Sequence, residues 1–187
     1  PVGRHPLRIL FLRLNAEAAD RRAEDLRLVA GAERRVAAGG ADGIEYELAT
    51  AFAQHLGVKL RMQVPPRFSD VIPMIARGEG DVAAAGITIT DMRRQRVRFA
   101  PPYQETRQQV VYRQGGPYPT SMRELPGYQL EVSGGTSYEE RLHQLKLLHP
   151  TLSWTVNDAV YTEELLQQVQ EELVHLTIAD SNIADLS

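Results

Sequence analysis

The sequence predicts an α/β protein built from two lobes. Apolar strand-like segments alternate with amphipathic helical segments, the alternation occurs in both halves of the chain, and an extended segment joins the halves. Such alternation is typical of sheets whose strands are connected by right-handed helical crossovers. We therefore expect lobe 1 at residues 1–106, an inter-lobe connector at residues 107–113 and lobe 2 at residues 114–187.

The first half contains the elements of one α/β unit. A nearly continuous apolar run predicts a strand at residues 7–14, and apolar residues at helical spacing predict a helix at residues 44–56. Gly57 ends this helix because glycine readily adopts the left-handed conformation of a helix C-cap. The other predicted elements are a strand at residues 58–64, stopped by Pro65 and Pro66, a helix at 69–77 capped by Ser69, and a strand at 81–85.

Residues 15–42 interrupt this unit. They are rich in Ala, Arg, Glu and Asp and contain few large apolar side chains, so they can bury little surface against a core. We expect an exposed helical insertion or a mobile loop. On this interpretation, replacing residues 15–42 by a short glycine linker leaves the thermal stability nearly unchanged.

The second half repeats the alternation after Gly115 and Gly116. Thr136 and Glu139 have the spacing of a capping box, which predicts the start of a helix that continues to about His149. The other predicted elements are the connector strand at 107–113, strands at 128–133, 152–156 and 174–179, and a helix near residues 162–173.

Composition excludes several classes of function. A net charge of −3 and a pI near 6.0 argue against a nucleic-acid-binding surface. The chain has no cysteine, its histidines lack metal-binding spacing, and no apolar run approaches the length of a transmembrane helix. We therefore expect no cofactor, no metal, no nucleic acid and no transmembrane segment. Because the chain starts at Pro1 without an initiator methionine, we expect a mature or trimmed fragment.

The segment at residues 84–93 carries the strongest functional signal. A buried strand is followed by Gly86 and by a hydroxyl-rich turn, in which Thr90 can cap a short helix that carries Arg93. An arginine fork binds a carboxylate through two parallel hydrogen bonds, and a helix N-terminus adds backbone donors for the same anion. The segment favours a small-carboxylate site. The alternative is a capped helix with a solvated arginine.

The predicted strand ends identify further candidates, because ligands of open α/β sheets bind beyond the carboxyl ends of the strands. The polar residues that follow predicted strands are Thr88 and Arg93 in the first half, and Thr136, Ser137 and Asp180 in the second half.

Five segments resemble, in order and in spacing, the successive motifs of the family 3 periplasmic solute-binding proteins. They lie at residues 43–49, 81–93, 97–103, 135–137 and 179–180. The resemblance runs from about residue 7 to the C-terminus and is interrupted by residues 15–42. Within that superfamily, the sequences at 45–48, 112–113 and 179–182 are most similar to the regulatory module of the membrane-bound lytic murein transglycosylase F family.

The resemblance implies a two-lobed periplasmic binding protein-like fold with ligand-binding residues in lobe 1. Arg93 matches the arginine that holds the α-carboxylate of the ligand, and Thr88 matches a hydroxyl beside it. Phe68 matches an aromatic residue that stacks on the ligand side chain. Ala85 departs from the family pattern, because many amino-acid-binding members have a serine there, and this implies a less polar pocket.

In lobe 2, the resemblance assigns Thr136 and Ser137 to hydroxyl and backbone donors at a helix start, and Asp180 to the carboxylate that receives the ligand ammonium. The residues themselves leave structural alternatives open. Phe68 can pack on its own helix as a hydrophobic staple, Asp180 can cap a terminal helix, and Thr136 caps a helix in either case. The chain ends soon after Asp180, where the family continues through a second crossover, so we expect a fold that is incomplete at the C-terminus.

The resemblance therefore implies a non-enzymatic module that closes on an amino acid or a cell-wall muropeptide. It also implies a periplasmic location and a catalytic transglycosylase module in a parent chain anchored to the outer membrane. The Glu-Ser dipeptide expected in that catalytic module occurs nowhere in this chain. Two alternatives are a stand-alone amino-acid receptor of an ABC transporter and a cyclohexadienyl dehydratase-like enzyme, with Glu45 or Glu105 as its general acid.

Overall fold

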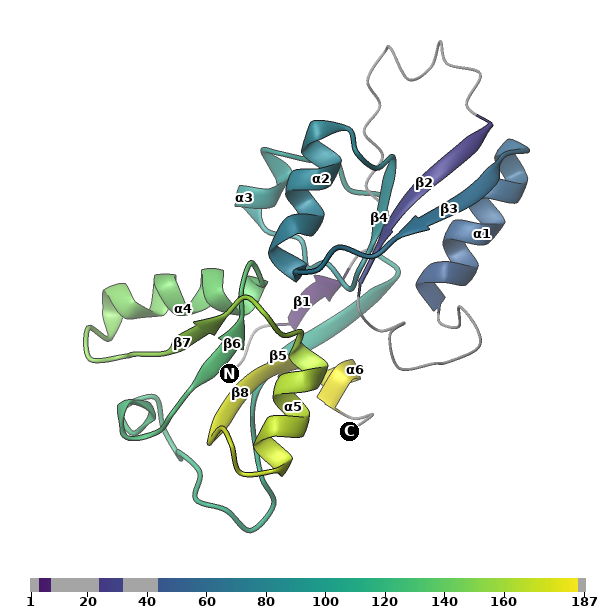
Figure 1. Ribbon diagram of the computed structural model, residues 1–187. Coiled ribbons are helices and arrows are strands. Elements are labelled where there is room, and N and C mark those ends of the chain that lie inside the picture. The colour runs from purple at the N-terminus through teal and green to yellow at the C-terminus, as the bar shows by residue number, and fades with distance from the viewer. Residues whose placement is uncertain (1–3, 8–23, 32–43, 185–187) are drawn as a thin grey trace. The chain divides into compact units, whose positions relative to one another are not determined.

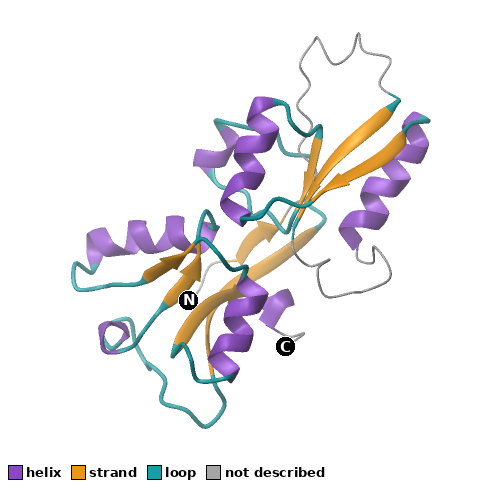
Figure 2. Cartoon of the chain, viewed as in Figure 1, coloured by secondary structure: helices purple, strands orange, loops and turns teal. Residues whose placement is uncertain are grey.

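The computed structural model describes residues 4–7, 24–31 and 44–184 (Figure 1). Its helices and strands confirm the predicted α/β class (Figure 2). The chain folds into two compact units: an N-terminal unit, Pro6–Gln104, and a C-terminal unit, which contains Glu105–Ser187 together with Pro1–His5.

The N-terminal unit is a parallel sheet covered by a helix on each face (Figure 1). Its strand order is β3-β2-β4, and its elements are β2 (Asp25–Ala30), α1 (Ile44–Leu56), β3 (Lys59–Gln63), a 3₁₀ turn η2 (Phe68–Asp70), α2 (Val71–Arg77), β4 (Val82–Ala84) and α3 (Asp91–Arg94). Side chains of β2 alternate between the two faces, as the two-residue period of a strand requires. Leu28 packs in the cluster that contains α1, whereas Val29 packs in the cluster that contains α2.

The predicted insertion contains the central strand of this sheet, so the prediction is wrong for residues 25–30. These residues form β2, and its Leu28 and Val29 are completely buried between the two helices. The apolar residues of this strand are few, and the charged and small residues around them dominate the composition of the 15–42 window. The average composition therefore hid the strand. The remainder of that window, apart from residues 24 and 31, lies outside the described residues. The strand predicted at 7–14 also lies outside them, apart from Leu7 at the end of β1 (Arg4–Leu7).

Most local signals in this unit are confirmed. Gly57 follows α1 with a φ of 68°, and Gly78 ends α2 with a φ of 77°, so both adopt the left-handed conformation. Ser69 was expected to cap a helix, but it lies inside the η2 turn, and α2 begins at Val71 with Asp70 in the cap position. None of the described helices combines the length and the apolar composition needed to cross a bilayer.

The C-terminal unit contains a three-stranded sheet and a two-stranded sheet, which are linked by one isolated bridge. β5 (Gln104–Tyr112) lies between β1 and β8 (Leu176–Asp180), and β5 and β8 run antiparallel. β6 (Glu131–Ser133) pairs in parallel with β7 (Thr155–Asn157), and a parallel bridge between Leu130 and Leu176 links β6 to β8. The helical elements are the 3₁₀ turn η3 (Leu125–Gly127), α4 (Ser137–Leu148), α5 (Thr162–Gln170) and α6 (Ser181–Ala184).

Candidate functional site

Arg93 is a buried residue of α3, the short helix that follows β4. The Thr90 hydroxyl oxygen accepts a hydrogen bond from the Arg93 backbone N–H at 3.3 Å, which confirms the predicted cap. The side chain is only 3 % exposed, and its Nη1 donates to the carbonyl oxygen of Thr88 at 3.0 Å. The alternative of a solvated arginine is therefore wrong, because the guanidinium is held inside the unit against the turn that carries Thr88.

Glu45 also contacts the turn that follows β4. Its Oε1 accepts a hydrogen bond from the Gly86 backbone N–H at 2.8 Å and another from the Tyr103 hydroxyl at 3.3 Å. Gly86 has a φ of 57°, a conformation that favours glycine over residues with a Cβ. Glu45 lies in the first turn of α1, so its carboxylate connects that helix to the turn between β4 and α3. Glu45, considered above as a general acid, therefore has a structural role, because its carboxylate positions the turn at Gly86.

The Glu45→Ala substitution should destabilise the N-terminal unit by about 1 kcal/mol, because it removes an acceptor shared by two donors. Urea denaturation measures this loss. Glu47→Ala is the matched control: Glu47 lies in the same first turn and is exposed, so both variants lose a similar interaction with the helix dipole. Equal denaturation midpoints for the two variants would contradict a positioning role for Glu45.

Phe68 and Thr88 complete the set of predicted residues in the N-terminal unit. Phe68 is partly buried and packs against the cluster formed by residues of α2 and the sheet, as a hydrophobic staple would. Thr88 is 2 % exposed, and its carbonyl group contacts Arg93. Ligand contacts of these two side chains stay predictions.

The N-terminus of α4 holds Thr136 and Ser137. The Thr136 hydroxyl donates to the Ser133 carbonyl oxygen at 2.8 Å and accepts from the Glu139 backbone N–H at 3.4 Å. The Glu139 carboxylate accepts from the Gly135 N–H at 2.8 Å, one residue before the position that an ideal capping box uses. The predicted cap is confirmed, and the donor of the Thr136 hydroxyl is used within the unit.

Ser137 has a neighbour that the sequence did not identify. Gln108 Nε2 on β5 donates to Ser137 Oγ at 2.8 Å, and both side chains are buried. Gln108 also pairs with Asp180 in the β5–β8 ladder. Gln108 and Thr106 are buried polar residues at alternate positions of β5, and that polar alternation was the available signal in the sequence.

Asp180, the last residue of β8, is also buried, with 2 % of its surface exposed. Its backbone N–H donates to the Tyr138 hydroxyl oxygen at 3.0 Å. Burial raises the pKa of Tyr138 well above its usual value, and the negative charge of Asp180 raises it further. Tyr138 therefore stays neutral beside Asp180. The sequence analysis did not identify this tyrosine as a candidate.

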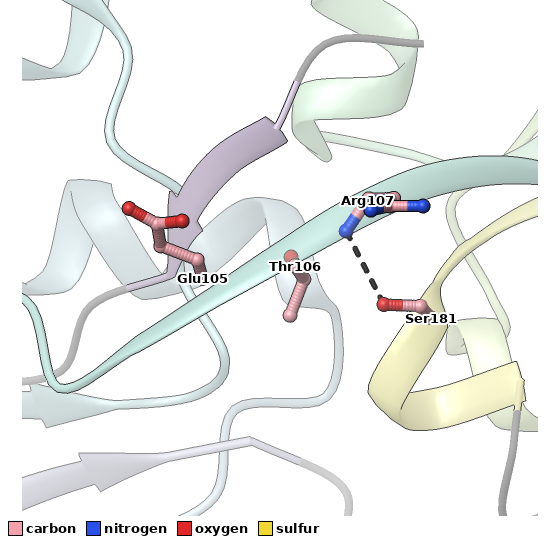
Figure 3. Close-up of a pocket in the computed structure, with 4 residues that line it drawn as sticks. All are labelled: Glu105, Thr106, Arg107 and Ser181. Carbon is pink, nitrogen blue, oxygen red and sulfur yellow. Dashed lines mark hydrogen bonds between the residues drawn. The ribbon is translucent and has the colours of Figure 1, made fainter.

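A small pocket of about 190 Å³ lies beside the start of β5 (Figure 3). It is lined by Glu105, Thr106, Arg107 and Ser181, and the Arg107 backbone N–H donates to Ser181 Oγ at 3.2 Å. Thr106 is 2 % exposed, and within the described part of the chain its hydroxyl has no hydrogen-bond partner. Glu105, the second residue considered as a general acid, is exposed at this pocket.

Each unit contains three of the predicted ligand-binding residues. Phe68, Thr88 and Arg93 belong to the N-terminal unit, and Thr136, Ser137 and Asp180 belong to the C-terminal unit. Among the described residues, no group of three His, Asp or Glu side chains is arranged to hold a metal ion. The arrangement offers a buried cationic group in one unit and a buried acidic group in the other.

Two curated relatives are membrane-bound lytic murein transglycosylases. The chain is 42 % identical over 144 residues to membrane-bound lytic murein transglycosylase F 1 of Alkalilimnicola ehrlichii, covering 76 % of this chain and 29 % of that protein. It is 39 % identical over 149 residues to membrane-bound lytic murein transglycosylase F of Maricaulis maris, covering 80 % of this chain and 33 % of that protein. The chain therefore spans about a third or less of the length of these relatives.

Solved structures of amino-acid-binding proteins have a similar fold. An ancestral arginine-binding protein bound to arginine matches with a TM-score of 0.75 and 26 % identity, over 89 % of this chain and 74 % of that chain. The holo form of ArgBP from T. maritima matches with a TM-score of 0.77 and 23 % identity, over 92 % of this chain and 75 % of that chain.

The model of the bacterial extracellular solute-binding proteins, family 3, matches residues 33–185. This match covers most of the chain, including the Arg93 segment, the start of α4 and Asp180. It confirms the resemblance drawn from the five sequence motifs. The chain belongs to family 3 of the bacterial extracellular solute-binding proteins.

Proposed function

We propose that this chain is a ligand-binding module that recognises an amino acid, or the peptide part of a cell-wall fragment, through a carboxylate/ammonium clamp. The observation that carries the proposal is the burial of two groups of opposite charge, Arg93 in the N-terminal unit and Asp180 in the C-terminal unit. Charged side chains are seldom fully buried in proteins unless a partner or a function compensates for their desolvation.

The proposed clamp uses each group for one end of a zwitterion. Arg93 binds the ligand carboxylate through its planar fork, and Thr88 lies beside it on the turn that Glu45 holds. Asp180 binds the ligand ammonium. A ligand that contacts both units favours the closed state by the difference between its affinities for the closed and open states.

The solved structures with a similar fold support the proposed class of ligand. One match at 26 % identity is an ancestral arginine-binding protein bound to arginine, and another is an ancestral arginine-binding protein bound to glutamine. These likenesses support an amino acid or a peptide terminus as the ligand. A stand-alone transport receptor stays the alternative function.

The curated relatives support a regulatory role in a larger protein. They are named membrane-bound lytic murein transglycosylases, and the chain matches about a third or less of their length. We infer that the parent protein joins this module to a catalytic transglycosylase module. In this arrangement the module senses peptidoglycan fragments in the periplasm, and ligand-induced closure controls the catalytic module of a protein anchored to the outer membrane.

The Asp180→Asn substitution should weaken binding of L-arginine or L-glutamine tenfold or more, because a neutral amide replaces the partner of the ammonium. Binding of the Nα-acetylated forms should change much less, since they bring no ammonium to the site. Isothermal titration calorimetry measures both affinities, after a thermal-shift screen of amino acids and stem peptides. Asp158→Asn, at an exposed aspartate of the same unit, is the control. An equal loss for free and acetylated ligands would contradict the assignment of Asp180.

A further inference from the structure

Gln108 lies next to two residues of the proposed ligand site. Its Nε2 donates to Ser137 Oγ at 2.8 Å, and its position in β5 pairs with Asp180 in β8. Residues that pair directly across an antiparallel ladder project their side chains from the same face of the sheet. Gln108 is only 8 % exposed, and Ser137 is 7 % exposed. The Gln108 amide is therefore a buried neighbour of Ser137 and lies on the same face of the sheet as Asp180.

The hydrogen bond from Gln108 fixes the role of the Ser137 hydroxyl. A serine hydroxyl has one proton to donate and can accept at its oxygen. Because Ser137 Oγ already accepts from Gln108, its own proton is not used in this contact and is available to another acceptor. Ser137 also begins α4, a helix whose positive N-terminal end favours an anionic acceptor.

Thr136, the neighbouring hydroxyl, is in a different situation. It donates to the Ser133 carbonyl oxygen and accepts from the Glu139 N–H, so its donor stays within the unit. Both hydroxyls assigned to the ligand accept a hydrogen bond, but the Thr136 proton is donated to Ser133, whereas the contact with Gln108 leaves the Ser137 proton available.

We propose that Gln108 is a positioning residue that makes the Ser137 hydroxyl a dedicated donor to a carboxylate oxygen of the ligand. The inference rests on the proposed function, and it deepens that function by naming which hydroxyl serves the ligand and what controls its direction. It predicts selectivity for ligands that present a free carboxylate over ligands that present an amide at the same position.

The Gln108→Glu substitution tests this inference because it inverts the polarity of the contact at nearly constant shape. An ionised carboxylate can only accept, so the Ser137 proton turns toward it and is lost to the ligand. The introduced charge also repels the ligand carboxylate. When the introduced carboxyl is protonated, it can donate to Ser137 Oγ again, and burial raises its pKa toward an accessible pH range.

The experiment is calorimetry with L-arginine, L-glutamine and a peptidoglycan stem tetrapeptide, each as the free acid and as the C-terminal amide. For the free acids, Gln108→Glu should weaken binding about tenfold or more at about pH 8, with recovery toward about pH 5, where ligand carboxylates are still ionised. For the amides, the loss should be much smaller. Gln109→Glu adds the same charge at the exposed next position of β5 and should leave all affinities unchanged.

Two further variants distinguish two roles of the Gln108–Ser137 hydrogen bond: orientation of the Ser137 hydroxyl for the ligand, and a purely structural link between β5 and α4. Ser137→Ala should weaken binding of the free acids as Gln108→Glu does, and combining the two should add little. Gln108→Met removes the donor without adding a charge, so its smaller loss should not depend on pH; it also serves as the test variant if Gln108→Glu does not fold.

The outcomes are distinct. If the wild-type protein binds none of the probes, the proposed function and this inference fall together. If the wild-type protein binds a free acid, but Gln108→Glu has the same affinity and pH profile, only the inference is overturned. An equal, pH-independent loss for acids and amides also overturns it, because a structural tie explains that result.

Discussion

The Arg93→Ala substitution should weaken binding of a free amino acid by about 2–5 kcal/mol, the usual cost of removing one partner of a buried, hydrogen-bonded charge pair. Arg93 is 97 % buried, so little water competes for its guanidinium. The substitution also removes the donor to the Thr88 carbonyl oxygen, which should lower the stability of the N-terminal unit. Calorimetry should therefore be read together with the thermal midpoint of the same variant.

Two variants isolate the ligand contact of Arg93. Arg93→Lys keeps the positive charge but loses the planar fork, so it should restore binding only in part. Arg94→Ala removes an exposed arginine from the adjacent position of α3 and should leave binding unchanged. Unchanged affinity in a folded Arg93→Ala protein would mean that the guanidinium has only a structural role in its contact with Thr88.

Local signals predicted much of the fold. Thr90 caps α3, Thr136 caps α4 and Gly57 ends α1, because each of these roles depends on residues within a few positions along the chain. The helix boundaries predicted from periodicity lie close to those observed for α1, α4 and α5. Ser69 is the exception, since the η2 turn precedes α2 and displaces its start to Val71.

The buried state of Arg93 and the role of Gln108 could not be predicted from their own segments. Buried Arg93 donates to the carbonyl oxygen of Thr88, on a turn that is held by Glu45, 41 residues before Gly86. Gln108 meets Ser137 across 29 residues of sequence, through the packing of β5 against the start of α4. Contacts of this range depend on tertiary structure. The clamp that joins the Arg93 and Asp180 groups stays a prediction for the same reason.

The position of β2 shows how composition misleads when a strand is short. Leu26, Leu28 and Ala30 pack toward α1, and Val29 packs toward α2, so every residue from 28 to 30 is part of a core. An alternating apolar pattern of this kind is a strand signal on its own, but it lay within a longer window dominated by arginine, alanine and acidic residues. A parallel strand buried on both faces needs only a few such residues.

Deletion of residues 24–31 should therefore abolish folding of the N-terminal unit, because the deletion removes the strand between β3 and β4. Leu28→Ala provides a graded test. Leu28 is completely buried, and truncation of a buried leucine costs about 2–5 kcal/mol through lost burial and the cavity that remains. Leu48→Ala makes the same truncation on α1 at a leucine that is 44 % exposed, and its cost should be well below that of Leu28→Ala. Urea denaturation followed by circular dichroism measures both. Equal stability of Leu28→Ala and Leu48→Ala would contradict the central position of β2 and favour the expected peripheral insertion at residues 25–30. In that case β2 could not be the strand that positions β4, the Gly86 turn and Arg93.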